Sequence, residues 1–184
     1  MKGNGLVLSP VAQTGFASAA AFANRDALKE IHRVLEPAGG FGMVWNIEDY
    51  NAPLSWRIHT GWETVMRDVV WSFHDAVPRF RHEKWRQAFD SQDSGGDNLP
   101  LFTLPLGEGI EEFETWLSKE EIWNRILTLS QIAILEGEEL DKVRRTFDHA
   151  INSDETVTDD QGRVAVHGRT YFAWTTSIPN KSAS

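Results

Sequence analysis

The sequence predicts an α/β fold built as one domain over residues 1–184. Residues 24–35 read as a helix, a Pro-Gly turn follows, and residues 41–45 form an apolar run typical of a strand buried on both faces. A helix, a turn and a strand in this order make up half of a βαβ unit. The length suits a single domain, because a chain of this size buries roughly 65 to 75 per cent of the surface that it exposes when unfolded.

The first helix has recognisable ends. Asn24 is placed to cap its start, and Asp26 lies in its positive first turn. Pro37 and the glycine pair at 39–40 end the helix and turn the chain. The apolar positions fall on one face, as expected for a helix that packs on a sheet. They are Ala27, Leu28, Ile31, Val34 and Leu35.

Residues 52–98 are expected to form a helical insertion or cap after the strand at 41–45. Within them, residues 56–77 read as a long helical region, because apolar side chains recur along one stripe. That stripe consists of Trp62, Val65, Met66, Val69, Phe73 and Val77. Residues 91–98 are polar and contain glycine, so we expect a loop there.

A capping signature marks the helix that follows. Residues 113–117 alternate like a strand, and Ser118 with Glu121 forms an S-x-x-E capping box. This pattern predicts a helix over residues 119–134.

The last part of the chain predicts one more helix and one more strand. Gly137 breaks the preceding pattern, and apolar residues then recur at helical spacing up to residue 151. Residues 163–175 alternate as a strand. The tail, residues 177–184, is expected to be flexible.

The composition limits the classes of partner. The net charge of -9 works against binding nucleic acid, whose affinity for proteins comes largely from Lys and Arg. No apolar run is long enough to span a bilayer, and the N-terminal residues do not resemble a secretory signal. The absence of cysteine suits a reducing compartment. We therefore expect a cytoplasmic protein with no nucleic-acid or membrane partner.

Several catalytic motifs are missing from the sequence. The six histidines include no H-x-x-x-H pair, so no protein-bound metal is expected. A nucleophile elbow and a P-loop are also absent. Gly107 and Gly109 lack a third glycine and read as a simple turn.

Two histidines, His59 and His74, are weighed as general bases, since an unperturbed imidazole titrates near neutral pH. The only carboxylate beside either of them in sequence is Asp75, which points elsewhere on a helix. The sequence therefore favours a structural role for both. The eight tryptophans suit a core or a pocket for an organic ligand, and a core is favoured for each one.

Several segments together resemble the second half of a class I S-adenosylmethionine-dependent methyltransferase. They are residues 11–13 (VAQ), 22–37 (FANRDALKEIHRVLEP), 39–40 (GG), 44–46 (VWN) and 117–121 (LSKEE). The resemblance is to the small-molecule group of the ubiquinone-methylase and aconitate-methylase type, common in fungi. It implies a truncated Rossmann-like methyltransferase sheet, about strands 4 to 7, with flanking helices and a helical insertion after the fifth strand.

The same resemblance implies methyl transfer from S-adenosylmethionine to a small organic molecule. Ligands of open α/β sheets bind at the carboxyl ends of strands. The resemblance places Gln13 near the cofactor and Trp45, Asn46 and Tyr50 toward the acceptor, with Trp62 as a pocket wall.

The sequence departs from that family in two respects. Residues 14–21 are mostly small, where the family usually has a compact aromatic and histidine-bearing segment. The family's first strand, glycine-rich loop and ribose-binding acidic residue should precede Val11, where the sequence has ten residues. The chain is therefore expected to be incomplete or inactive by itself, and whether it is an enzyme is left open. Alternatively, it is a repurposed small-molecule-binding accessory protein. It also has an expected sheet edge near residues 6–13, which a second copy or a partner chain would cover.

Overall fold

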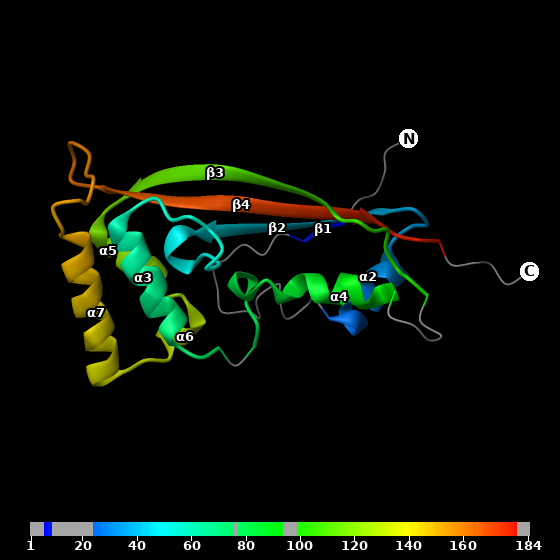
Figure 1. Cartoon of the computed structure of the whole chain (residues 1–184), viewed down its shortest axis with the longest axis horizontal. Coiled ribbons are helices and arrows are strands. Elements are labelled where there is room, and N and C mark those ends of the chain that lie inside the picture. Colours follow the sequence, from blue (N-terminus) through cyan, green and yellow to red (C-terminus); the bar gives the residue numbers. More distant parts are fainter. Residues whose placement is uncertain (1–5, 9–23, 76, 94–98, 180–184) are drawn as a thin grey trace, which may run out of the picture.

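The computed structural model describes residues 6–8, 24–75, 77–93 and 99–179 (Figure 1). Gln13 and residues 180–184 of the predicted tail lie outside the described residues. Residues 177–179 of that tail are described, and the backbone amides of Ser177 and Ile178 donate hydrogen bonds to the carbonyls of Gly39 and Leu101, respectively.

Four strands form one sheet in the order β1-β2-β4-β3. Strand β1 runs parallel to β2, whereas β4 is antiparallel to both of its neighbours. The strands are β1 (Leu6–Leu8), β2 (Gly40–Glu48), β3 (Gly107–Leu117) and β4 (Val164–Thr176). The predicted α/β class and the predicted four-stranded part of a sheet are confirmed.

The described helices lie on one side of the sheet, below it in Figure 1. They are α2 (Arg25–Val34), α3 (Gly61–Ser72), α4 (Gln87–Asp90), α5 (Lys119–Ile126), α6 (Ser130–Ala133) and α7 (Gly137–Ile151). In the described part of the chain, no helix is long and apolar enough to cross a bilayer.

This one-sided cover corrects the prediction for the first apolar strand. Burial alternates along β2: Phe41, Met43 and Trp45 are buried, whereas Gly42 is half-buried and Asn46 is exposed. The strand is thus not buried on both faces, because the described helices pack on only one of them. It also continues to Glu48, beyond the predicted end at residue 45.

Two apolar clusters hold the helices to the sheet. The first lies beneath β2 and β4, and its largest members are Trp45, Phe80, Trp85, Phe89, Phe102 and Tyr171. The second joins α3, α5, α6 and α7 to the start of β4, and includes Tyr50, Trp62, Met66, Ile122, Phe147 and Val166. At about 25 cal/mol per Å² of buried apolar surface, these aromatic-rich clusters supply most of the driving force for folding.

The long helical region predicted over residues 56–77 is shorter than expected. Helix α3 starts at Gly61, where the Thr60 side chain accepts a hydrogen bond from the Glu63 amide. Just before this start, the His59 amide donates its hydrogen bond to the Asp49 side chain, from the beginning of the same loop, and not to a helical carbonyl. A tertiary contact thus overrides the helical periodicity of the residues before Gly61.

The predicted helix over residues 119–134 is split into α5 and α6. Its start is confirmed, with Ser118 and Glu121 forming both hydrogen bonds of a capping box. The break follows from Thr128, whose amide and hydroxyl both donate to the Arg125 carbonyl and tighten the last turn.

The predicted turn at Gly107 and Gly109 is wrong, since both residues belong to β3. They pair with Trp174 and Phe172 of β4, whose stacked rings lie over them. A Cβ on Gly109 would lie 2.3 Å from the Phe172 ring. The two glycines are needed because the rings of Trp174 and Phe172 lie close to the backbone of β3. The glycines therefore mark a close contact within the sheet and not a turn.

Replacing Ser118 by alanine should lower stability, because the first turn of α5 loses its side-chain cap. The expected cost is about 1 kcal/mol, or a fall of about 2–4 °C in the melting temperature. Thermal unfolding followed by circular dichroism measures it. Ser130→Ala is the matched control, since its hydroxyl bonds only the neighbouring Gln131 side chain. Equal melting temperatures for the two variants would contradict the cap's contribution.

Candidate functional site

A buried carboxylate follows β2. The strand runs into the single 3₁₀ turn Asp49–Asn51, in which the Asp49 side chain has no exposure to solvent. Its Oδ2 atom accepts a hydrogen bond from the His59 amide (2.9 Å) and lies 2.7 Å from His59 Nδ1. With Nδ1–H donating to the carboxylate, the neutral ring leaves Nε2 as a free acceptor.

A second pair of the same kind lies beside the first. The fully buried Glu63 of α3 accepts a hydrogen bond from the His167 amide (2.7 Å), and its Oε2 atom lies 3.1 Å from His167 Nδ1. The Thr60 hydroxyl donates to the same oxygen at 2.7 Å. Burial raises the pKa of Glu63 above its ordinary value, and the hydrogen bonds from His167 and Thr60 offset this only in part.

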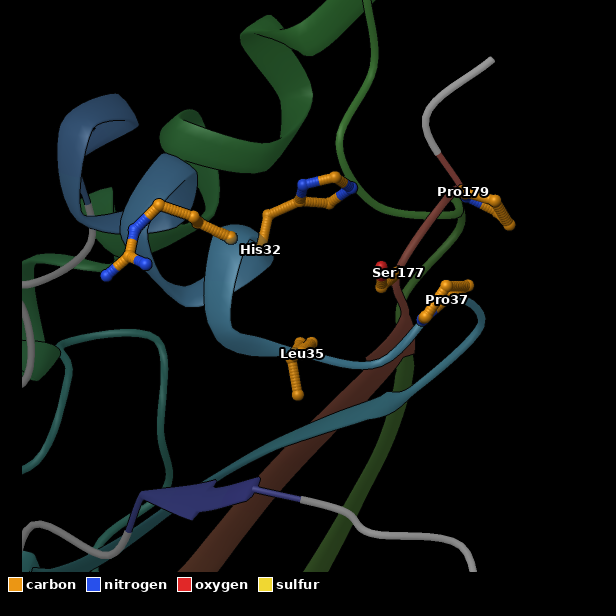
Figure 2. A pocket seen from close by; sticks show the side chains of 6 residues that line it. His32, Leu35, Pro37, Ser177 and Pro179 are labelled. Atoms are coloured by element: carbon orange, nitrogen blue, oxygen red, sulfur yellow. The ribbon is translucent and has the colours of Figure 1, made fainter. Parts of the chain in front are cut away.

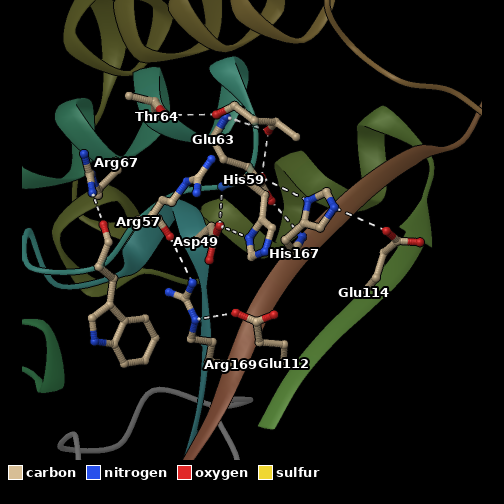
Figure 3. A network of polar contacts seen from close by, with 12 residues as sticks. Asp49, Arg57, His59, Glu63, Thr64, Arg67, Glu112, Glu114, His167 and Arg169 are labelled. Carbon is tan, nitrogen blue, oxygen red and sulfur yellow. Dashed lines mark hydrogen bonds and ion pairs between the residues drawn. The ribbon is translucent and has the colours of Figure 1, made fainter. Parts of the chain in front are cut away.

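The two imidazole rings are stacked. The ring centroids of His59 and His167 are 4.7 Å apart and the rings are inclined by 15°, as Figure 3 shows. The far nitrogen of His167, Nε2, lies 3.3 Å from Glu114 Oε2. His167 is therefore flanked by two carboxylates, whereas His59, whose side chain is 34% exposed, has one.

These rings open onto a cavity of about 260 Å³. Its lining combines polar groups with aromatic and aliphatic walls: His59, Thr60, Trp62, Glu114, Trp116, Val157, Ala165 and His167. Pockets of this mixed character are where proteins bind small organic molecules, although this one is slightly smaller than the usual range of roughly 300–1,000 Å³.

The structure brings two of the expected acceptor residues together. Tyr50 and Trp62 are both buried, and their ring centroids lie 6.2 Å apart. Of the two, Trp62 lines the cavity. Burial, with the nearby charge of Glu48, raises the pKa of the Tyr50 hydroxyl well above its ordinary value, so the hydroxyl stays protonated at neutral pH.

Two other expected site residues, Trp45 and Asn46, do not line this cavity. Trp45 is buried among the rings of the first cluster, with Trp85 4.9 Å away between centroids. Asn46 faces the opposite side of β2, where its Oδ1 atom accepts a hydrogen bond from the Thr170 hydroxyl at 2.7 Å. Gln13, expected near the cofactor, lies outside the described residues.

Neither carboxylate partner, Asp49 or Glu63, was predicted from the sequence. The statement that His59 has no orienting carboxylate is wrong, because Asp49 reaches it from ten residues earlier. Asp49 lay within the loop that the sequence singled out, but nothing in its spacing marks it as a partner of His59. Nothing in the sequence marks His167 as a site residue, since a histidine in an alternating strand is common. His74 is exposed and does not line the cavity.

A second cavity, of about 190 Å³, lies between the end of α2 and the end of β4 (Figure 2). Its lining includes His32, whose Nε2 lies 2.7 Å from the Ile178 carbonyl. This ring fastens the C-terminal segment to α2, and we regard the second cavity as structural. Among the described residues, no group of three or more metal-binding side chains is placed to hold an ion.

Comparisons with known proteins find methyltransferase-like relatives of this chain. It is 31% identical over 127 residues to an uncharacterised methyltransferase-like protein of Schizosaccharomyces pombe, covering 69% of this chain and 43% of that protein. A second uncharacterised methyltransferase of the same yeast is 28% identical over 138 residues, covering 73% of this chain and 49% of that protein. The predicted resemblance to methyltransferases is confirmed by these two relatives. The chain spans about half the length of these relatives.

Two further comparisons add little to this relationship. No family model matches the sequence. The crystal structure of a methyltransferase candidate from Bacillus halodurans C-125 aligns with 94% of this chain and 63% of its own, with 15% identity and a TM-score of 0.41.

Replacing Glu63 by glutamine should remove a decrease in the free energy of unfolding that occurs in the wild type as the pH rises. The folded-state pKa of Glu63 is raised above 4.5, so the folded protein holds this proton more tightly than the unfolded chain does. The carboxyl's contribution to the free energy of unfolding is full below about pH 4.5 and is lost as the pH rises through the raised pKa.

Urea unfolding of the wild type and of Glu63→Gln at several pH values between 4 and 7 measures this contribution. The stability of the wild type relative to the variant should fall as the pH rises. A difference that stays constant or grows with pH would show that the pKa of Glu63 is not raised by folding.

Proposed function

We propose that this chain takes part in methyl transfer from S-adenosylmethionine to a small organic molecule. The names of the two yeast relatives support methyl transfer in general. The single observation that carries the proposal is the Asp49–His59 pair at the mouth of the cavity, because it provides a proton acceptor beside a space for an acceptor molecule.

Methyl transfer to a protonated acceptor atom requires a general base such as this pair. A nitrogen or oxygen atom that accepts a methyl group needs a free lone pair. If that lone pair is bound to a proton, the proton must leave first. His59 Nε2 can take that proton, and the buried Asp49 carboxylate stabilises the imidazolium that results. Triads of hydrolytic enzymes use a carboxylate in the same way, to fix the tautomer and orientation of a histidine.

His167 acts here as a positioning residue. Both of its ring nitrogens face carboxylates, those of Glu63 and Glu114, so neither is free to take a proton from an acceptor. Its ring stacks on that of His59 and limits the rotation of the second ring. A general base held in one orientation avoids the entropic cost of alignment.

The described residues supply the acceptor side of this reaction. When bound, S-adenosylmethionine provides the methyl group. The two cavities described above are smaller than the usual volume of a pocket for a ligand of that size. Because Gln13 also lies outside the described residues, no residue is assigned to the cofactor. A cytoplasmic location fits the proposal, since the sequence contains no cysteine.

Calorimetric titration of the purified chain with S-adenosylmethionine and S-adenosylhomocysteine tests the proposal. Binding of both with one site per chain is the result that methyl transfer by this chain alone requires. Circular dichroism and light scattering must show a folded, monodisperse sample at the same time. Absence of binding at millimolar cofactor to such a sample would overturn methyl transfer by this chain.

Replacing His59 by alanine should lower the methyl-transfer rate by about 10²–10⁴-fold, the usual contribution of a general base. Mass spectrometry of the methylated product, with benzylamine and benzyl alcohol as acceptors, measures the rate. His149→Ala is the matched control, because His149 is exposed in the last turn of α7. An unchanged rate in His59→Ala would remove His59 from the chemistry.

A further inference from the structure

The cavity beside the stacked histidines is acidic. Among the described residues that line it there is a carboxylate, Glu114, but no Lys or Arg. Two further carboxylates, Asp49 and Glu63, lie directly behind the histidines. A cleft lined by charge of one sign and walled by apolar groups concentrates molecules of the opposite charge.

Glu114 is held in place at the cavity wall. Its Oε1 atom accepts a hydrogen bond from Trp116 Nε1 (2.9 Å), and its Oε2 atom lies 3.3 Å from His167 Nε2. The side chain nevertheless keeps 49% of its surface exposed. Figure 3 shows it reaching from β3 toward the two rings. Its negative charge is therefore fixed in direction and accessible to a ligand.

The neighbouring arginines do not neutralise the cavity. Arg169 Nε donates to Glu112 Oε1 (3.2 Å), and another nitrogen of its guanidinium donates to the Arg57 carbonyl (3.0 Å). The same guanidinium lies 4.9 Å from the centre of the Trp56 ring. Arg67 donates to the Trp56 carbonyl and is not among the lining residues. Arg169 and Arg67 are thus engaged outside the cavity, and the exposed Arg57 is not among its lining residues.

Seven buried side-chain polar atoms are left without a hydrogen-bond partner in the described part of the chain, and two of them belong to this site. One is Asp49 Oδ1, on a side chain with no solvent exposure, and the other is Nε1 of the cavity residue Trp62. Buried polar groups are almost always hydrogen-bonded, so these two point to a ligand or to a function. Among the described residues, the Asp49 side chain is therefore hydrogen-bonded to His59 alone.

Aromatic walls complete the site. Trp62 and Trp116 both line the cavity. The face of a tryptophan ring attracts cations, and aromatic residues grouped with a carboxylate are a usual means of recognising organic ammonium groups.

We propose that this cavity binds a small organic amine in its cationic form and that Glu114 selects for that charge. The proposal rests on the proposed function for the reaction that follows binding. Deprotonation then breaks one N–H bond of the ammonium group. The proton passes to His59 Nε2, and the bonding pair stays on nitrogen as the lone pair that a methyl acceptor needs. A carboxylate of the same shape is repelled by Glu114, so an acceptor of the aconitate type does not fit.

Three probes of matched shape test this selection: benzylamine, benzyl alcohol and benzoate. Their binding to the full chain without cofactor, followed by NMR shifts of the tryptophan indole signals, gives three dissociation constants. We expect benzylamine to bind about tenfold more tightly than benzoate at low salt, with benzyl alcohol between them. Glu114→Gln should reduce the tenfold ratio to about twofold.

Glu111→Gln is the matched control, because Glu111 is exposed on the same strand and does not line the cavity. It should keep the wild-type ratio. Benzoate binding as tightly as benzylamine, or an unchanged ratio in Glu114→Gln, would overturn the proposal. The outcome is separable from the cofactor titration: charge selection without cofactor binding would refute the methyl-transfer proposal alone, and cofactor binding without charge selection would refute the amine proposal alone.

Discussion

The buried carboxylate of Asp49 is the constraint around which the site is organised. A carboxylate with no access to water is stable only with a hydrogen-bonded partner, and here the backbone and ring of His59 supply it. This contact fixes the loop between β2 and α3, and so sets where α3 begins. That start in turn places Glu63 against His167, so that one carboxylate–histidine pair positions the other.

The loop after β2 is held at successive residues. Asn51 accepts a hydrogen bond from the buried Arg81, and the Ala52 carbonyl accepts one from Trp71 Nε1. Since Trp71 and Arg81 belong to the segment after the strand, that segment clamps the loop as well as covering the sheet. A rigid loop suits a proton acceptor, whose efficiency depends on alignment.

Capping patterns in the sequence predicted where helices start, whereas the geometry of the site depends on contacts between residues that are far apart in the sequence. The caps at Asn24 and Ser118 are confirmed, because a cap depends on residues three positions apart. The start of α3 and the one-sided burial of β2 depend on which other elements pack there, and periodicity carries no information about that. The Glu63–His167 pair joins residues 104 positions apart, which no spacing rule reaches.

The two histidine pairs differ in how early they can form. Asp49 and His59 are ten residues apart, and loops of that length close in about 10–100 ns. Glu63 can meet His167 only after β4, the last of the described strands, has entered the sheet between β2 and β3. The ring stack therefore assembles late in folding, and a nascent chain holds one half of the site before the other exists.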